Sequence, residues 1–404
     1  MKAAVLGGGA AGFFGAISIK ETNPEAEVCI FEKSDKILSK VKVSGGGRCN
    51  VTNGLSDIDE FVENYPRGSK ELIPVFTRFG SRETIDWFES HSVQLKTEPD
   101  NRVFPTSDNS DTIIECLLKE TQIRNIQIKN HYSPGKIIKK EDGFVLYFKN
   151  GEEFECDKIL IATGGNAKAE SYEWIKSLGH TIIEPLPSLF TFTLSQNIFK
   201  GLEGISVPEV EIIFTDGKTF RQKGSLLITH GGLSGFGILK FSAFAARELA
   251  KKKYEFTLSI SWLPGFKKEY LSDKISELKK SIPNKTLSSM SYLGLPLRLW
   301  KRLLEINGLE NNKFIDLSNQ KIINFVNSLS EQKLEIAGKN TNKEEFVTAG
   351  GVCLKEVNFK TMESKICPGI YFAGEVLDID AVTGGFNFQS AWSTGRIAGI
   401  SIGS

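Results

Sequence analysis

The sequence predicts an α/β protein in which both ends of the chain build one parallel sheet and a second domain is inserted between them. Both ends show a short apolar run, then glycines, then a helical pattern, at 2–22 and 369–390. Between them, 189–262 alternates apolar and polar residues, which is typical of antiparallel strands. Residues 266–336 have helical spacing and are rich in Lys, Glu, Leu and Asn. The insertion is therefore expected to be β-rich first and helical afterwards.

These changes of pattern also set the expected domain boundaries. The first domain takes residues 1–188 and 346–404, and the inserted domain takes residues 189–345. A chain of 404 residues is long enough to bury two separate cores. We expect the first domain to bind a cofactor and the inserted domain to cover the substrate.

Composition narrows the classes of partner and compartment. The net charge is +1, so the chain as a whole lacks the basic excess that nucleic acid or an anionic membrane attracts. Six scattered cysteines with no C-x-x-C, and only four histidines, indicate reduced thiols and no metal site. The apolar start, 1–19, has no cleavage signal, and no run is long enough to span a membrane. We therefore expect a soluble cytoplasmic protein.

The first glycine-rich turn has the spacing G-x-G-x-x-G at Gly7, Gly9 and Gly12, between a strand at 2–6 and a helix. The first glycine permits the tight turn, the second lets a pyrophosphate approach the backbone, and the third lets helix and strand pack closely. Glu32, at the end of the next strand, is placed to bind ribose hydroxyls. A tight turn alone is the simpler alternative, but the whole unit predicts a Rossmann-like dinucleotide site. Its expected contacts are Gly7, Gly9, Ala10, Ala11, Gly12, Glu32 and Lys33.

The chain between the two ends continues this domain with different elements. Helices are expected at 57–64, 69–79, 81–90 and 111–119, and 33–53 is expected to be a loop. A hairpin follows at 136–149, turning at Asp142-Gly143, and then a buried strand at 158–162. Residues of these segments expected to contact the cofactor are Ile137, Ala162, Thr163, Gly164 and Gly165.

The closing segment repeats the strand, glycine and helix pattern with an acid added. Glu375 follows a buried strand, where its carboxylate can bind a ribityl chain, and Gly384-Gly385 opens a helix. The positive end of that helix would favour a flavin whose N1–C2=O edge becomes negative on reduction. A nicotinamide dehydrogenase would instead add further βα units, so we predict FAD. An ordinary turn with a solvated acid is the alternative. The expected contacts here are Gly374, Glu375, Asp380, Gly385, Phe386, Asn387 and Phe388.

A loop rich in glycine offers the third set of candidate contacts. This loop, at 44–50, first exposes its glycine backbone and then presents the cation of Arg48, the thiol of Cys49 and the amide of Asn50. Such groups suit contact with a pyrophosphate or a flavin. A solvent-exposed loop is the alternative. Arg48 and Cys49 are also candidate catalytic residues, although no second cysteine supports a redox pair, so Cys49 fits a packing role as well. The loop's expected contacts are Ser44, Gly45, Gly46, Gly47, Arg48, Cys49 and Asn50.

His230 is the remaining candidate catalytic residue. It follows an apolar strand and precedes two glycines, so it can protonate a substrate or simply cap a turn. We expect the substrate to lie where the inserted domain covers the flavin, with the 44–50 loop, His230 and Thr348 as its walls.

Four motifs together resemble one bacterial flavoprotein family, that of aminoacetone-oxidase-like and bile-acid-pathway NAD(P)/FAD-dependent oxidoreductases. The resemblance covers essentially the whole chain and implies a FAD domain of the two-dinucleotide-binding-domain type with a β-rich and helical insertion. It does not imply a particular substrate. The motifs are Ser44 to Asn53, Thr229 to Gly235, Thr348 to Val352, and Gly374-Glu375 through Gln389.

The resulting hypothesis is a FAD-dependent oxidoreductase that transfers a hydride at flavin N5 to or from a small organic substrate. NAD(P)H is a possible electron donor that would visit transiently, because no second G-x-G-x-x-G has the strand and helix around it. A flavoprotein acting on tRNA and a non-catalytic FAD-binding module are the two alternatives. No nucleic acid or membrane partner is expected, and the sequence does not predict an oligomeric state.

Overall fold

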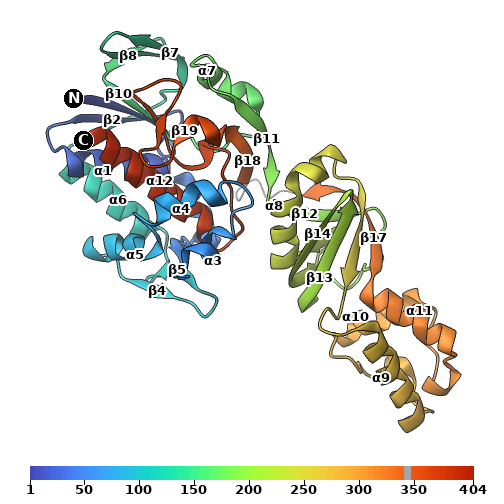
Figure 1. Ribbon diagram of the computed structural model, residues 1–404. Coiled ribbons are helices and arrows are strands. Elements are labelled where there is room, and N and C mark those ends of the chain that lie inside the picture. Colours follow the sequence, from blue (N-terminus) through green and yellow to red (C-terminus); the bar gives the residue numbers. More distant parts are fainter. Residues whose placement is uncertain (341–346) are drawn as a thin grey trace. The chain divides into compact units, whose positions relative to one another are not determined.

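A computed structural model describes residues 1–340 and 347–404 of the chain. It divides into two units, Met1–Ser188 with Lys343–Ser404 and Leu189–Asn342 (Figure 1). The boundary expected between 345 and 346 lies outside the described residues. Each unit has its own sheet and its own core, and each is described by itself below.

The first unit is built on a seven-stranded sheet in the order β19-β20-β21-β10-β1-β2-β6. The five strands from β21 to β6 are parallel, and the short β20 and β19 continue the sheet as an antiparallel edge. This is the predicted Rossmann-like α/β sheet, to which both ends of the chain contribute. The bounds are β1 Lys2–Leu6, β2 Glu27–Glu32, β6 Gln127–Asn130, β10 Lys158–Ile161, β19 Val357–Asn358, β20 Glu363–Ser364 and β21 Ile370–Phe372.

Two helices from opposite ends of the chain, α1 (Ala10–Thr22) and α12 (Phe386–Gly403), pack side by side on one face of this sheet (Figure 1). Glycines make the close approach possible. A Cβ on Gly395 would lie 2.6 Å from the Ala11 carbonyl oxygen, and one on Gly399 would lie 2.4 Å from that of Gly15. These contacts run in the same order along both helices, so α1 and α12 are parallel.

The other face of the sheet carries a small antiparallel layer, β7 (Pro134–Lys140), β8 (Gly143–Phe148) and β9 (Glu153–Cys156). Its first two strands are the predicted hairpin, with Gly143 at the start of β8, and β9 is an addition to that prediction. Phe31 of β2 contacts Phe148 and Phe154, with ring centroids 4.6 and 4.9 Å apart. The first unit therefore has three layers.

The first unit contains further helices and short strands between those of the parallel sheet. The expected loop at 33–53 contains a helix and a short strand, so that expectation was too simple. The helices at 69–79 and 111–119 were correctly expected, with ends that differ by a few residues. The bounds are α2 Ser39–Gly47, β3 Thr52–Asn53, α3 Ile58–Val62, α4 Ser69–Phe76, α5 Ser81–Ser90, β4 Leu95–Thr97, β5 Arg102–Pro105, α6 Asp111–Ile123, η1 Ala169–Tyr172, α7 Glu173–Lys176, β11 Ile182–Ser188, β18 Val347–Val352, η4 Leu354–Glu356 and η5 Gly374–Val376.

The second unit contains a closed antiparallel barrel in the order β12-β15-β14-β13-β16-β17. Strand β13 alternates buried and exposed side chains along much of its length, and this pattern predicted strands in the first part of the insertion. One expectation was wrong, because residues 332–336 belong to the strand that closes the barrel and not to a helix. The segment 189–262 is β-rich as expected, and it also contains a helix at 236–251 that was not predicted. The bounds are β12 Thr191–Leu194, β13 Ser206–Asp216, β14 Lys218–Ile228, β15 Gly232–Ser234, α8 Phe236–Lys251, β16 Phe256–Ser261 and β17 Gln332–Asn340.

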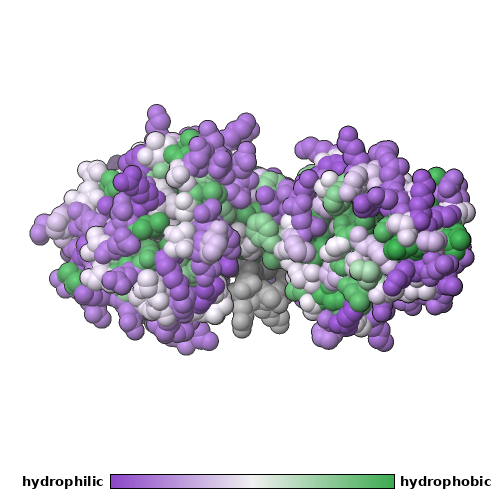
Figure 2. Space-filling model, turned by 90° about the horizontal axis from the view of Figure 1, so that it is seen from below, coloured by the Kyte–Doolittle hydropathy of each residue, from purple (hydrophilic) through white to green (hydrophobic). Residues whose placement is uncertain are grey.

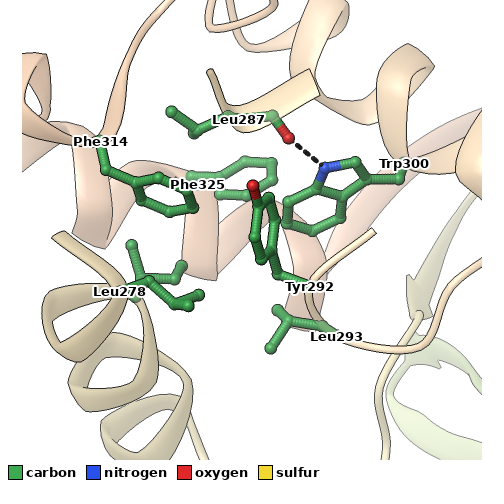
Figure 3. Close-up of a pocket in the computed structure, with 8 residues that line it drawn as sticks. Leu278, Leu287, Tyr292, Leu293, Trp300, Phe314 and Phe325 are labelled. Atoms are coloured by element: carbon green, nitrogen blue, oxygen red, sulfur yellow. Dashed lines mark hydrogen bonds between the residues drawn. The ribbon is translucent and has the colours of Figure 1, made fainter. Parts of the chain in front are cut away.

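The helical end of the second unit is held by aromatic residues. A small apolar pocket there is lined by Tyr292, Trp300, Phe314 and Phe325 together with four aliphatic residues (Figure 3). The Trp300 indole N–H donates to the Leu287 carbonyl oxygen at 2.8 Å. The pocket contains no charged side chain, so it forms part of the core and not a catalytic centre. The bounds are α9 Lys268–Ser281, η2 Leu287–Ser289, α10 Leu297–Ile306, η3 Phe314–Asp316 and α11 Asn319–Ser330.

The visible surface of both units is mostly hydrophilic, with scattered apolar residues (Figure 2). Phe266, Tyr270 and Ile315 are among the large apolar side chains that are about half exposed. Across residues 1–340 and 347–404, no helix has both the length and the apolar character needed to cross a membrane.

Candidate cofactor site

The C-terminal edge of the parallel sheet gathers the glycine-rich turns of the first unit. The strands β1, β2, β10 and β21 all end at this edge because they run in the same direction. From β1 the chain first continues to β2 on one side, and β10 lies on the other side, so the strand order reverses between β1 and β10. Ligands of open α/β sheets bind at such a reversal.

The first turn leaves space for a ligand at one glycine only. A Cβ on Gly7 would lie 2.3 Å from the Ala162 carbonyl oxygen, and one on Gly12 would lie 1.9 Å from that of Gly7. A Cβ on Gly9 would meet nothing within 4 Å. Gly7 and Gly12 are therefore required by the fold, whereas Gly9 borders the open space at the N-terminus of α1. The free N–H groups of this helix end suit a pyrophosphate.

Glu32 closes the next loop at the same edge. One carboxylate oxygen accepts from the Gly8 N–H at 2.9 Å, and the other accepts from the Ser34 N–H and hydroxyl, both at 3.0 Å. The carboxylate is partly exposed and lies beside the G-x-G-x-x-G turn, as a ribose-binding acid requires. Lys33 is exposed. Contacts of both residues with a cofactor stay predictions.

Glu375 lies at the end of β21, beside the turn that follows β10. Its carboxylate accepts from the Thr348 N–H at 2.8 Å and forms an ion pair with Lys40 at 2.5 Å. The structure thus adds Lys40, from α2, and the Thr348 backbone as partners of this acid. No sequence signal distinguished Lys40 from the other lysines of its segment. A Cβ on Gly165 would lie 2.9 Å from the Glu375 carboxyl carbon, so this glycine lets the acid approach the turn.

The N-terminus of α12 is fixed by side chains of the segment 52–65. The Asn53 amide donates to the Gly384 carbonyl oxygen at 3.0 Å, and the Tyr65 hydroxyl donates to that of Phe386 at 2.5 Å. Thr52 contacts the buried Gln389 side chain at 2.5 Å. Tyr65 was not a candidate from the sequence, because a single tyrosine after a helical segment gives no signal of such a role.

The two helix N-termini lie at different heights above the same edge of the sheet. Gly395 of α12 faces Ala11 of α1, so α12 begins about two turns, roughly 12 Å, before α1. The N–H groups of Phe386, Asn387 and Phe388 belong to the first turn of α12, which has no intrahelical acceptors for them. One helix end can thus meet a pyrophosphate and the other a group further along the same molecule. The donors, the acids and the space at Gly9 fit FAD.

The 44–50 loop combines open backbone with side chains that are already paired. Gly46 and Gly47 have positive φ, and a Cβ on either would meet nothing within 4 Å. Arg48 forms an ion pair with Glu98 at 2.7 Å and lies over the Phe104 ring at 3.9 Å. Cys49 is fully buried, and burial raises the pKa of its thiol to about 12. A thiol held protonated in this way is a poor nucleophile, which weighs against a catalytic role for Cys49.

Asp380 is engaged within the protein and lies away from solvent. Its carboxylate is fully buried, pairs with Arg67 and accepts from the Ser188 hydroxyl at 2.5 Å. Burial raises the pKa of Asp380, and the Arg67 charge opposes that rise. These contacts give Asp380 a structural role as the anchor of the closing segment. Ile137 is buried in β7. A direct cofactor contact for either residue stays a prediction.

The candidate catalytic histidine belongs to the second unit. His230 is exposed on the turn between β14 and β15, and its carbonyl oxygen accepts from the Asn197 amide at 2.8 Å. Its role stays a prediction. In the first unit, the buried His180 joins Glu356 at 3.1 Å and the Ser364 hydroxyl at 2.9 Å. Ser364 also accepts from two backbone N–H groups and is itself buried, so this trio stabilises a turn.

The described residues contain no group of three or more His, Cys, Asp or Glu side chains that could hold a metal ion.

Comparisons with known proteins match almost the whole chain to a single protein family. A model of the HI0933-like protein Rossmann domain matches residues 1–401. The chain is 27% identical to a 3-dehydro-bile acid delta(4,6)-reductase of Clostridium scindens over 98% of this chain and 97% of that protein. It is 29% identical to a ribosomal RNA dihydrouridine synthase of Escherichia coli over 97% of this chain and 95% of that protein. The structure of 3-ketosteroid-delta4-(5alpha)-dehydrogenase from Rhodococcus jostii is similar in fold, with a TM-score of 0.51, 13% identity, and coverage of 100% of this chain and 96% of that one.

Proposed function

The chain belongs to the HI0933-like protein Rossmann domain family and is a FAD-dependent oxidoreductase, and we propose that it reduces a carbon–carbon double bond conjugated to a carbonyl group. The observation that carries this proposal is the pair of parallel helices α1 and α12, whose N-termini point at one edge of the sheet about two turns apart. Together they suit the two halves of FAD.

The residues proposed to hold the cofactor follow from the site. The turn at Gly7 to Gly12 would bind the pyrophosphate through the N-terminus of α1, with Glu32 at the adenosine ribose. Glu375 would bind the ribityl chain. The N–H groups of Phe386, Asn387 and Phe388 would face the N1–C2=O edge of the flavin, where the positive helix end stabilises the negative charge of the reduced form.

The reaction class comes from chemistry that two relatives share by name. A 3-dehydro-bile acid delta(4,6)-reductase and a dihydrouridine synthase both saturate a double bond that is conjugated to a carbonyl. When bound and reduced, FAD would supply a hydride to the carbon remote from the carbonyl, and the neighbouring carbon would gain a proton. His230 is the candidate proton donor from the sequence analysis. Our first candidate substrate is a small cyclic enone.

Stopped-flow spectroscopy without oxygen tests this proposal. NADH or NADPH should bleach the flavin absorbance within seconds, and a cyclic enone added afterwards should restore it at a rate that increases with enone concentration. An unrelated saturated ketone is the control and should leave the flavin reduced. If dithionite-reduced enzyme is not reoxidised by any enone or uracil compound, the proposed reaction is wrong and a non-catalytic FAD module becomes the better hypothesis.

A second candidate substrate, a uracil base within RNA, is favoured by the charge of the inserted segment. Residues 189–342 contain 22 Lys and Arg against 14 Asp and Glu, a net charge of +8 that the total of +1 conceals. The exposed rings of Phe266 and Tyr270 stack at 5.1 Å with an angle of 11°, next to Lys267 and Lys268. Exposed aromatic rings beside cations suit stacking on unpaired bases. This distribution weakens the exclusion of nucleic acid that rested on total charge.

RNA binding separates the two substrate candidates. If RNA is the substrate, affinity for a uridine-rich single strand should decrease about tenfold in Phe266→Ala/Tyr270→Ala and fall steeply between 50 and 200 mM salt. Enone turnover by the same variant should be unchanged. Ile315→Ala, which removes another exposed apolar side chain of this unit, is the matched control. Absence of salt-dependent RNA binding by the unaltered protein would leave the small enone as the substrate class.

A further inference from the structure

The hydroxyl of Thr348 is buried, and it has no hydrogen-bond partner within the described part of the chain. Buried hydroxyls are nearly always paired, so an unpaired one in a native structure needs an explanation. We propose that the Thr348 hydroxyl donates a hydrogen bond to a ribityl hydroxyl of bound FAD. This inference rests on the assignment of FAD to the site.

The surroundings of Thr348 place its hydroxyl among the groups of the cofactor site. The Thr348 N–H donates to the Glu375 carboxylate at 2.8 Å. A Cβ on Gly165 would lie 2.8 Å from the Thr348 hydroxyl oxygen and 2.9 Å from the Glu375 carboxyl carbon. The hydroxyl, the acid and the turn after β10 therefore meet at the C-terminal edge of the sheet, at residues of the first unit alone.

The pairing of a donor with an acid indicates which part of FAD is recognised. A hydroxyl group both accepts and donates, so it can accept from Thr348 while it donates to Glu375. A phosphate oxygen only accepts, and it would be repelled by the Glu375 carboxylate. The position of Glu375 in the sheet also fits the ribityl chain better than the pyrophosphate. Glu375 follows β21, and β10 separates that strand from β1 and from the N-terminus of α1, where the pyrophosphate is proposed to bind. Thr348 is thus a positioning residue for the ribityl chain.

The substitution Thr348→Val tests this role because it removes the hydroxyl and keeps the shape. In protein stripped of flavin, the melting temperature should rise by about 2–4 °C, because an unpaired buried hydroxyl is lost. The Kd for FAD should increase about tenfold, the usual effect of one hydrogen bond. The Kd for ADP, which lacks the ribityl chain, should stay within about twofold of that of the unaltered protein. Thr348→Ser keeps the hydroxyl and should bind FAD within about threefold.

The matched control is Ser330→Ala, because the Ser330 hydroxyl is also buried without a partner but lies inside the second unit. It should change neither FAD nor ADP affinity. The inference is overturned if Thr348→Val binds FAD as the unaltered protein does, if it loses ADP and FAD affinity equally, or if its flavin-free form melts at a lower temperature. Failure of the unaltered protein to bind FAD would contradict the assignment of the cofactor itself, which is a separate result.

Discussion

The two glycine-rich turns that the chain's ends bring to the sheet are built in different ways. The first turn, Gly7 to Gly12, is held by its own backbone, by the neighbouring strand end at Ala162, and by the nearby Glu32 carboxylate, which accepts from the Gly8 N–H. The closing turn, Gly384-Gly385, is held by side chains from 52–65, and the segment before it is anchored by Arg67 on Asp380. A local motif specifies the first turn, whereas residues more than 300 positions away in sequence specify the second.

This difference explains why the two turns have different tolerance to change. A turn packed closely against backbone fails where an added Cβ would meet a carbonyl group, and it tolerates a substitution where the space is open. A turn held by side chains fails when one distant partner is removed. Four substitutions test the contrast.

The largest expected effect is that of Arg67→Met, which leaves Asp380 buried without its partner. Removing one member of a buried ion pair costs about 3–5 kcal/mol. Burial already raises the pKa of Asp380 with Arg67 present, and loss of the arginine should raise it further. Between the ordinary pKa of an aspartate and this raised pKa, the folded variant holds a proton that the unfolded chain has released. The variant's free energy of unfolding should therefore be higher at pH 5 than at pH 8, and it should decrease as the pH rises through the raised pKa.

Urea denaturation at pH 5 and pH 8 measures this effect. The double variant Arg67→Met/Asp380→Leu is the control and should recover most of the stability, without the dependence on pH. Equal losses at both pH values would show that Asp380 does not titrate as described.

The next largest effect is expected for Gly12→Ala in the first turn. The new Cβ would lie 1.9 Å from the Gly7 carbonyl oxygen, so helix α1 has to move away from β1. We expect a loss of about 3 kcal/mol and protein that purifies without flavin. Flavin content and urea denaturation are the measurements. A variant with normal flavin content would show that the backbone of the turn can shift to accommodate the new Cβ.

Gly385→Ala should have a smaller but clear effect on the closing turn. Gly385 has φ +94°, and a Cβ would lie 2.4 Å from the Thr52 carbonyl group. A loss of about 2 kcal/mol is expected, together with a more negative flavin reduction potential as the N-terminus of α12 shifts. Gly47→Ala, also at positive φ but in open space, is the control and should cost only about 1 kcal/mol. A potential equal to that of the unaltered protein would argue against the helix end facing the flavin.

The smallest effect on stability is expected for Gly9→Ala. Its backbone is extended and no atom lies within 4 Å of the added Cβ, so the free energy of unfolding should change by less than about 0.5 kcal/mol. FAD affinity should nevertheless decrease at least tenfold, because the methyl group enters the space for the pyrophosphate. Isothermal titration with FAD measures this. Unchanged affinity would place the pyrophosphate elsewhere.

Much of the fold followed from local pattern. The βαβ unit at 2–32, the hairpin at Asp142-Gly143 and strands β12, β13 and β16 of the barrel were predicted correctly. The errors share one physical cause. Residues 332–336 were expected to be helical, but β17 pairs with β12 and β16, and such pairing is invisible in a single segment. Helix α8 was missed because the pattern around it was assigned to strands.

The candidate site residues also divide into those that a local pattern predicts and those that depend on contacts between distant segments. Gly7, Gly9, Gly12 and Glu32 could be predicted because fixed spacing within one βαβ unit dictates where they meet. Lys40, the partner of Glu375, and Tyr65, which binds the start of α12, could not be predicted because no motif marks either residue. Thr348 lies in a motif and was expected at the substrate, but nothing in its pattern indicated that its hydroxyl is buried without a partner among the described residues. Asp380 was expected at the cofactor, since the sequence showed an acid near a helix start but not the arginine that engages it.

The sequence by itself determined the class of sheet, the dinucleotide turn and the insertion, because hydrophobic period and glycine spacing act over a few residues. Only the tertiary structure decided which acids stay partly exposed at the edge of the sheet, as Glu32 and Glu375 do, and which one is fully buried against an arginine, as Asp380 is. It also decided how far α12 extends beyond α1, and which hydroxyl is left unpaired. These properties depend on distances between segments that are hundreds of residues apart, and burial and pairing between such segments have no local signature.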